Sequence, residues 1–208
     1  MKKGLLAVLL AAAMVVPAFA AKGDMSVNAK LGLGVNNSVS LDVKDFGGPD
    51  GVFYKFDTEM PFSIGAEFFY GLMDNLSVGL GVNYGFDSKL KKTPFGSTDI
   101  KAGTTNIYLA VKPEAKIDSS IFSSIYLIGQ LGLSMMRADI DASGAPDLDI
   151  KSGLYLGFGI GTTIKDCVIV ELICSSANGT IEKGSFIPAD VNVQYTATTI
   201  NVGYKFNI

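Results

Sequence analysis

Apolar and polar residues alternate along most of the chain after residue 21. From Ser26 to Asn36 every odd position is Val, Ala or Leu, and every even position is a polar residue or glycine. A period of two is the pattern of a β-strand with one apolar and one polar face. Similar segments follow at about residues 62–71, 76–86, 105–116, 125–134, 154–163, 168–173 and 198–208. The pattern therefore predicts eight strands.

The connections between the predicted strands alternate in length. Short ones fall near residues 72–75, 117–120 and 165–167, and long ones at about residues 37–61, 87–104, 137–151 and 175–197. This alternation is typical of outer-membrane barrels. Although 48% of the residues are hydrophobic, no apolar run after Ala21 approaches the ~20 residues of a membrane helix. Because a bilayer tolerates only helices and closed barrels, we predict an all-β fold over residues 21–208. It is an eight-stranded antiparallel transmembrane up-and-down β-barrel with short periplasmic turns and four longer extracellular loops.

The first twenty residues have the form of a signal peptide. Lys2 and Lys3 precede the apolar stretch Leu5 to Val16, and Ala18-Phe19-Ala20 is a small-x-small cleavage motif. The apolar stretch is too short for a permanent membrane helix, so we expect residues 1–20 to be removed after export. The chain has 17 basic and 20 acidic residues, and loss of the two lysines leaves a net charge of about −5. This charge argues against nucleic acid as a partner.

Outward-facing aromatic residues fall near the ends of the predicted strands. If both termini are periplasmic, three of these residues lie at the outer rim of the barrel and three at the inner rim. Aromatic side chains collect at both membrane interfaces, so the positions predict two membrane girdles. The outer-rim residues are Phe62, Tyr84 and Phe86, and the inner-rim residues are Tyr70, Tyr204 and Phe206.

The inward faces of the predicted strands carry charged and amide residues among small ones. The interior of an eight-stranded barrel is just wide enough to be filled by side chains. One interpretation is an ion-pair and hydrogen-bond network across the lumen, because buried charges persist only when they are paired. The other is a polar lumen that passes or binds a small solute. The candidate lumen residues are Lys30, Glu67, Lys112, Gln130, Glu171 and Lys205.

The sequence gives little support for metal binding or catalysis. Four oxygen-bearing residues in one long loop are spaced like the opening of a calcium loop, but Ile150 stands where a bidentate Glu belongs. These weak calcium candidates are Asp139, Asp141, Ser143 and Asp147. The chain contains no His, so a His-dependent catalytic triad cannot be assembled. We predict no enzymatic activity, no catalytic residues and no cofactor.

Two stretches carry a family likeness. Residues 70–81 read Tyr-Gly-Leu-Met-Asp-Asn-Leu-Ser-Val-Gly-Leu-Gly, and residues 202–208 read Val-Gly-Tyr-Lys-Phe-Asn-Ile. With the alternation of the whole mature chain, they resemble the small outer-membrane β-barrel superfamily, which includes OmpA-like, OmpX-like and opacity-type porin-like barrel domains. The resemblance implies an outer-membrane location, contact with outer-membrane lipid and lipopolysaccharide, and recognition of the C-terminal strand by the barrel-insertion machinery. Such families usually end in an aromatic residue, whereas here Ile208 is last and Phe206 shares its face.

The pattern and the resemblance together favour a structural or surface-interaction role, adhesion-like, for a monomeric barrel with a polar lumen filled by side chains. A first alternative is a narrow channel or binding barrel for a small solute, as the OmpW-like barrels suggest. A second alternative is a soluble periplasmic barrel of the lipocalin kind. That barrel would bury the Leu and Val faces and expose the Gly, Asn and Lys faces. The sequence does not identify a surface ligand.

Overall fold

The computed structural model describes residues 23–43, 52–91, 99–117, 119–141, 150–181 and 190–208. In these ranges the chain forms ten β-strands, and there is no helix of the length and hydropathy needed to cross a membrane. The strands are β1 (Met25–Val43), β2 (Val52–Asp57), β3 (Phe62–Met73), β4 (Leu76–Gly85), β5 (Ser88–Lys89), β6 (Asp99–Lys116), β7 (Phe122–Asp141), β8 (Ile150–Ile164), β9 (Val168–Ile181) and β10 (Val191–Asn207).

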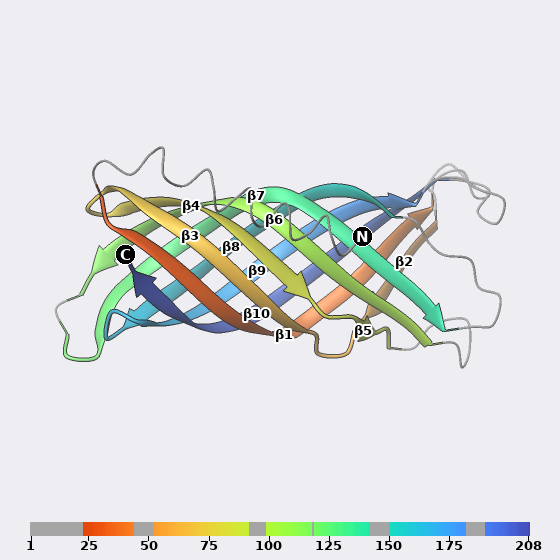
Figure 1. Cartoon of the computed structure of the whole chain (residues 1–208). Coiled ribbons are helices and arrows are strands. Elements are labelled where there is room, and N and C mark those ends of the chain that lie inside the picture. The colour runs from red at the N-terminus through yellow and green to blue at the C-terminus, as the bar shows by residue number, and fades with distance from the viewer. Residues whose placement is uncertain (1–22, 44–51, 92–98, 118, 142–149, 182–189) are drawn as a thin grey trace.

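Eight strand positions close into a ring of antiparallel neighbours (Figure 1). The order around the ring is β1, β3, β4, β6, β7, β8, β9 and β10, and β10 pairs back with β1. Two short strands continue this wall: β2 pairs with β1 beyond the end of β3, and β5 pairs with β6 beyond the end of β4. Ring closure pairs the first strand with the last, which is how a barrel satisfies its backbone in a bilayer. The predicted eight-stranded barrel is confirmed.

The part of the barrel next to the short turns is here called the lower part and lies on the left in Figure 1. It has an apolar outer wall and a polar inner wall. Leu80, Leu131 and Ile160 are 41%, 52% and 45% exposed on the outside. Lys112 and Glu171 are 3% and 2% exposed on the inside. This is the facing predicted from the alternation. The lipocalin-like alternative requires the reverse facing and is therefore wrong.

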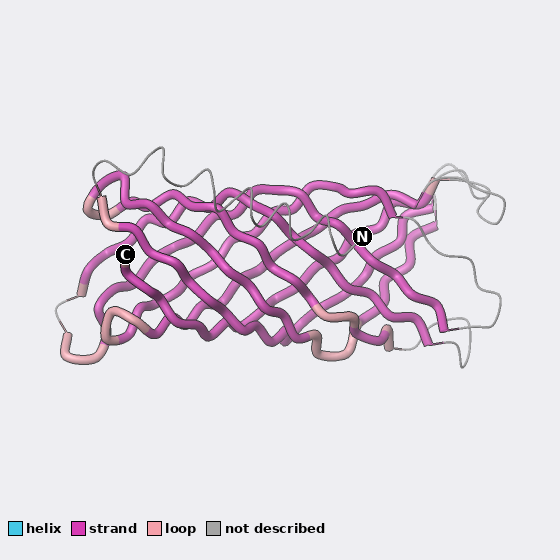
Figure 2. Tube along the Cα trace, viewed as in Figure 1, coloured by secondary structure: helices cyan, strands magenta, loops and turns pink. Residues whose placement is uncertain are grey.

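The strands extend well beyond the segments that alternation predicts (Figure 2). Added strand residues are 37–43 in β1, 99–104 in β6, 135–141 in β7, 150–153 in β8, 174–181 in β9 and 191–197 in β10. Most of these residues fall in the ranges predicted to be long connections. The part of each range that the structure describes is mostly strand. The predicted loop boundaries are therefore wrong by about four residues or more. The barrel therefore has an extension beyond its lipid-facing part.

The inside of this extension is mostly apolar. Odd residues of β10 point inward along its whole length, and they are Asn201 and Thr199 in the lower part but Tyr195 and Val193 in the extension. Val39 of β1, which is paired with Tyr195, is buried as well. The polar side chains now lie outside. In the extension, apolar side chains thus point inward and polar ones outward, as in a barrel surrounded by water. The lower part has the opposite arrangement, as in a barrel surrounded by lipid.

At four places near this boundary, an irregularity along a strand reverses the face to which the following side chains point. In β1 the register shifts between Gly34 and Asn36, so Val35 is an extra residue. Such a bulge moves every later side chain to the other face. Asn36, predicted to face inward, is therefore exposed, and Asn37 is buried instead. The other irregularities are the β2–β3 break at residues 58–61, the β4–β5 break at residues 86–87, and the register shift between Ser152 and Tyr155 of β8.

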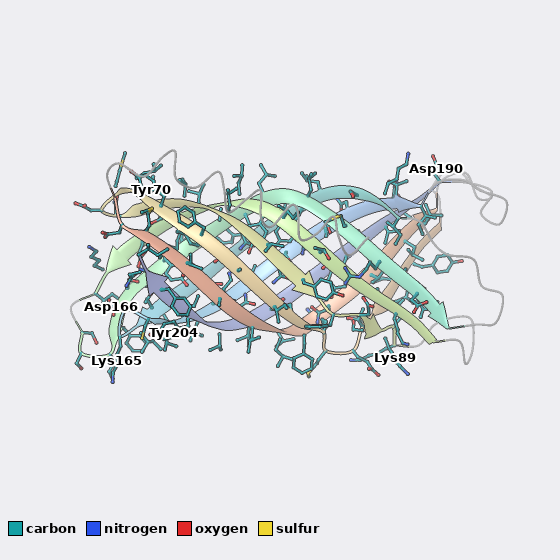
Figure 3. All side chains as sticks on the ribbon, viewed as in Figure 1. Tyr70, Lys89, Lys165, Asp166, Asp190 and Tyr204 are labelled. Carbon is teal, nitrogen blue, oxygen red and sulfur yellow. The ribbon has the colours of Figure 1, made fainter. Side chains whose placement is uncertain are left out.

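Short turns close the lower end of the barrel. Asp74-Asn75 joins β3 to β4, and residues 165–167 join β8 to β9 with Lys165 and Asp166 at φ of 48° and 59°. Asp is one of the residues that accept this left-handed conformation more readily than most. Figure 3 shows Lys165 and Asp166 at the same end as Tyr70 and Tyr204, with Lys89 and Asp190 at the opposite end.

Candidate functional site

A buried ion cluster, here called the ion layer, crosses the lumen of the lower barrel. It consists of Lys30 from β1, Glu67 from β3 and Glu171 from β9. The Lys30 Nζ atom lies 2.6 Å from Glu67 Oε1 and 2.8 Å from Glu171 Oε2, and all three side chains are at most 3% exposed. One ammonium group thus joins two carboxylates that come from distant parts of the chain.

Two tyrosines complete the hydrogen bonding of these carboxylates. The Tyr108 hydroxyl of β6 donates to Glu67 Oε1 at 2.9 Å, and the Tyr126 hydroxyl of β7 donates to Glu171 Oε1 at 2.9 Å. Each carboxylate therefore receives one ammonium N–H and one phenol O–H. Hydrogen bonds to a charged group are stronger than those between neutral groups, and buried charges without such partners are costly.

Gln130 of β7 links the ion layer to the next strand. Its Nε2 atom donates to Glu67 Oε1 at 3.2 Å, and its Oε1 atom accepts a hydrogen bond from the Tyr155 hydroxyl of β8 at 2.8 Å. The rings of Tyr155 and Tyr108 lie 5.4 Å apart between centroids. The contacts form one continuous network that ties six strands of the wall together across the lumen: β1, β3, β6, β7, β8 and β9.

The six lumen residues predicted from the sequence are not all in this network. The structure brings Lys30, Glu67, Gln130 and Glu171 together. Lys112 lies nearby but pairs with Glu114 at 3.3 Å, and its Nζ atom sits 4.6 Å from the centre of the Phe69 ring and 4.9 Å from that of Tyr126. Such placement over ring faces is favourable for an ammonium group. Lys205 is half-buried on β10, opposite Asn28, and is outside these contacts.

The tyrosines of the network are not among the predicted lumen residues, although the alternation places them on inward faces. A usable signal was present in the strand pairing. Tyr108 stands opposite Gly81, and Tyr126 stands opposite Gly161. A Cβ atom at Gly161 would lie 2.5 Å from Tyr126 Cζ. The glycine leaves room for the ring to cross the lumen, so an inward Tyr opposite an inward Gly marks a side chain that reaches the barrel centre.

A cavity of about 50 Å³, here called the chamber, lies between the ion layer and the extension. Lys30, Tyr108 and Gln130 of the network form part of its lining. Its other polar lining residues include Ser63, Asn83, Thr104, Asn106, Thr199 and Asn201. Asn106 Nδ2 donates to Thr104 Oγ1 at 3.4 Å, while the buried Asn106 Oδ1 has no hydrogen-bond partner in the described part of the chain.

Above the chamber the lumen is filled by apolar side chains, here called the apolar cap. Val39, Met136, Ala177, Val193 and Tyr195 are each less than a tenth exposed and pack in one cluster. Tyr195 and Ala177 also form part of the chamber lining. Along its axis, the described lumen therefore contains three levels: a charged network, a small polar cavity and an apolar core.

The six predicted girdle residues lie on the outer wall of β3, β4 and β10 or at their ends. Phe62, Phe86, Tyr204 and Phe206 are 64%, 45%, 47% and 51% exposed, and Tyr70 and Tyr84 are half-buried. Tyr204 packs against Phe206 with 4.7 Å between ring centroids, and Tyr84 against Phe86 with 5.2 Å. At the other end of β7 from the short turns, the Arg137 guanidinium lies 4.4 Å from the centre of the Tyr84 ring.

The calcium prediction falls mostly outside the described residues. Ser143 and Asp147 are not described, nor is the side chain of Asp141, and Asp139 is exposed near the end of β7. Among the residues that the structure describes, no group of three or more His, Cys, Asp or Glu side chains could hold a metal ion. Cys167 and Cys174 are both free thiols.

A closed antiparallel ring with an apolar outside and a charged, sealed inside defines a transmembrane β-barrel. A family profile described as "Outer membrane protein beta-barrel domain" matches residues 6–206. The chain belongs to this family, and it is an outer-membrane protein whose strands span the lipid. No curated protein sequence matches the chain.

Several solved structures have a similar fold at low sequence identity. Ail, the attachment invasion locus protein of Yersinia pestis, in complex with the heparin analogue sucrose octasulfate, is 13% identical with a TM-score of 0.50, over 89% of this chain and 100% of that chain. Neisserial surface protein A is 19% identical with a TM-score of 0.47, over 89% and 100%. OprG from Pseudomonas aeruginosa is 16% identical with a TM-score of 0.47, over 88% and 96%. At these identities the likeness concerns the fold alone.

Proposed function

We propose that the protein is a structural and surface-interacting barrel, adhesion-like in role, whose lumen does not conduct solutes. The observation that carries this proposal is the ion layer. Opening the lumen at this level requires Lys30 to leave both Glu67 and Glu171, at distances of 2.6 and 2.8 Å, within a buried site. Removing one partner from a buried ion pair costs several kcal/mol, so the layer is a stable closure. The apolar cap adds a second closure.

The extension supports the surface-interaction part of this proposal. The extension, here called the collar, continues the strands beyond the lipid-facing wall, and its outer side carries exposed polar side chains such as Lys55, Asn178 and Gln194. Residues on a rigid scaffold at the membrane surface are well placed to contact other macromolecules.

The proposal includes a placement in the membrane. The short turns face the periplasm and the collar faces the exterior, and residues 1–20 are a signal peptide removed on export. Phe62, Tyr84 and Phe86 form the outer girdle, and Tyr70, Tyr204 and Phe206 the inner one, in contact with lipid and lipopolysaccharide. The insertion machinery reads the C-terminal strand, which is β10. The protein acts as a monomer, without cofactor, nucleic-acid partner or enzymatic activity, consistent with a sequence that contains no His.

Conductance in planar bilayers tests the closed lumen. We expect no single-channel steps from the wild-type barrel. The variant Lys30→Ala/Glu67→Ala/Glu171→Ala, combined with Met136→Ala and Tyr195→Ala in the apolar cap, removes both closures and should give steps or raise solute flux into liposomes. A matched control, Lys55→Ala/Asp57→Ala/Glu59→Ala, removes one basic and two acidic side chains from exposed positions and should stay silent. A difference in gel mobility between unheated and heated samples verifies that each variant is folded.

A conducting wild-type barrel would overturn the proposal and favour the alternative, a narrow channel or binding barrel. The chamber is the observation that favours this second candidate, because it provides a solute-sized polar space directly above the ion layer. Steps of the same amplitude in the combined variant and in the control variant would show that the ion layer and the apolar cap are not what closes the lumen.

A further inference from the structure

We propose that the chamber is a binding site for a small neutral molecule that carries an N–H or O–H donor, of the size of a primary amide. The inference goes beyond the surface role proposed above and depends on the closed floor that the ion layer provides. It is drawn from the shape, charge and hydrogen-bonding capacity of the chamber.

The volume of the chamber sets the size of its occupant. A cavity needs a volume of roughly 10–15 Å³ to hold one water molecule. The chamber has about 50 Å³, so it holds a few waters or one molecule of about four non-hydrogen atoms. Aromatic compounds and sugars are too large for it.

The charge of the lining excludes ions as preferred occupants. Lys30 is the one charged residue among those that line the chamber in the described part of the chain. Its ammonium group is already shared by Glu67 and Glu171, and the three side chains together carry a net charge of −1. An anion therefore meets a net negative layer, and a cation meets the ammonium group first. A neutral molecule avoids both penalties.

The orphan oxygen of Asn106 determines the chemistry that the occupant must supply. Asn106 is 6% exposed, and its Oδ1 atom has no hydrogen-bond partner within the described chain. A buried acceptor without a donor is unfavourable, so the occupant gains by offering an N–H or O–H group. Asn83 and Asn201 add further amide groups to the lining, which suit both a donor and an acceptor on the same molecule.

One side of the chamber is apolar and gives the occupant a place for a methyl or methylene group. Ile173 and Ala177 of β9 and Ala197 of β10 form part of the lining. A primary amide with a methyl group, such as acetamide, matches the polar atoms, the apolar contact and the size together. Binding of so small a molecule is expected in the millimolar range, because affinity is limited by the number of atoms in contact.

Methyl NMR of the full chain in detergent micelles tests the site with acetamide as the probe. The Ile173, Ala177 and Ala197 methyl signals should shift and saturate as acetamide is added, while the Ile128 methyl, which is 0% exposed and outside the lining, should not. Acetate, of similar size but charged, should bind at least tenfold more weakly. The variant Asn106→Leu should also weaken acetamide binding at least tenfold.

The control variant is Asn178→Leu, the same substitution at an exposed position of β9, which should bind acetamide as the wild type does. A chamber filled only by water would give no saturable acetamide shift, and that result overturns the proposal. Equal binding by the Asn106→Leu variant, in a sample that is folded by gel mobility, overturns it as well. The measurement is made at equilibrium, so a failure here is distinct from a failure of the conductance test.

Discussion

Lys30 is held between two carboxylates that reach it from β3 and β9, on either side of it in the ring. Its removal would leave Glu67 and Glu171 facing each other in a buried site with only neutral donors. Removal of Glu67 is less severe, since Lys30 keeps its 2.8 Å contact with Glu171. Among the three residues of the ion layer, the lysine is therefore the one whose loss costs the barrel most.

We predict that Lys30→Met lowers the free energy of unfolding by about 3–5 kcal/mol, the usual cost of breaking a buried ion pair from one side. Urea unfolding in detergent, followed by circular dichroism because the chain has no Trp, measures the change. Lys55→Met, at an exposed position, should change stability by less than about 0.5 kcal/mol. The triple variant Lys30→Met/Glu67→Gln/Glu171→Gln should recover much of the loss. Equal destabilisation by both single variants would contradict the role of the ion layer.

At the scale of strands, the network tyrosines Tyr108 and Tyr126 each depend on a glycine in the neighbouring strand. Tyr126 of β7 stands opposite Gly161 of β8, with no room for a Cβ atom between them. Gly129 of β7, in contrast, has open space where its Cβ would be. Glycine is thus required at one position and replaceable at the other, although both lie in the same pair of strands.

We expect Gly161→Ala to destabilise the barrel by about 1–3 kcal/mol, because the added methyl group pushes the Tyr126 ring away from Glu171. Gly129→Ala should be neutral or slightly stabilising, since glycine weakens a strand interior. Thermal transitions in detergent, read from the gel mobility of samples heated stepwise, would rank the two variants. The opposite ranking would show that the ring relocates without cost.

The strands of the lower barrel could be predicted from the sequence because lipid outside and polar side chains inside give one unbroken alternation. The extension could not, because the alternation reverses there. In β10 the inward residues change from Asn201 to Val193 without any break in the strand, and in β1 the extra residue Val35 shifts the phase. A pattern that reverses looks like the end of a strand. The three residues of the ion layer are among the six predicted lumen residues, but their pairing depends on the tilt and register that bring β1, β3 and β9 together.

At the scale of the whole molecule, the barrel consists of two parts with opposite facing on the same strands. The lower part carries exposed apolar residues such as Leu131, and the collar carries exposed polar residues such as Asn178. Because the long connections lie at the collar end and the short turns at the other, the proposed orientation places the collar outside the cell.

Labelling of introduced cysteines in intact cells tests this orientation, in a background where Cys167 and Cys174 are replaced by Ser. Asn178→Cys, on the collar, should react with a membrane-impermeant maleimide. Asp74→Cys, in a short turn, should react only after the outer membrane is permeabilised, and Leu131→Cys should react in neither case because lipid covers it. Labelling of Asp74→Cys in intact cells, without labelling of Asn178→Cys, would reverse the proposed orientation.

The bulge at Val35 has a consequence for how the gene can change. Loss of that single codon would join Gly34 directly to Asn36 and turn the following collar residues of β1 around, so that Val39 pointed to water and Ser38 to the centre. Insertions at the collar tips leave this phasing untouched. Lineages of this protein should therefore vary freely in length at the tips of the collar, while every irregularity at the lipid boundary stays fixed in position.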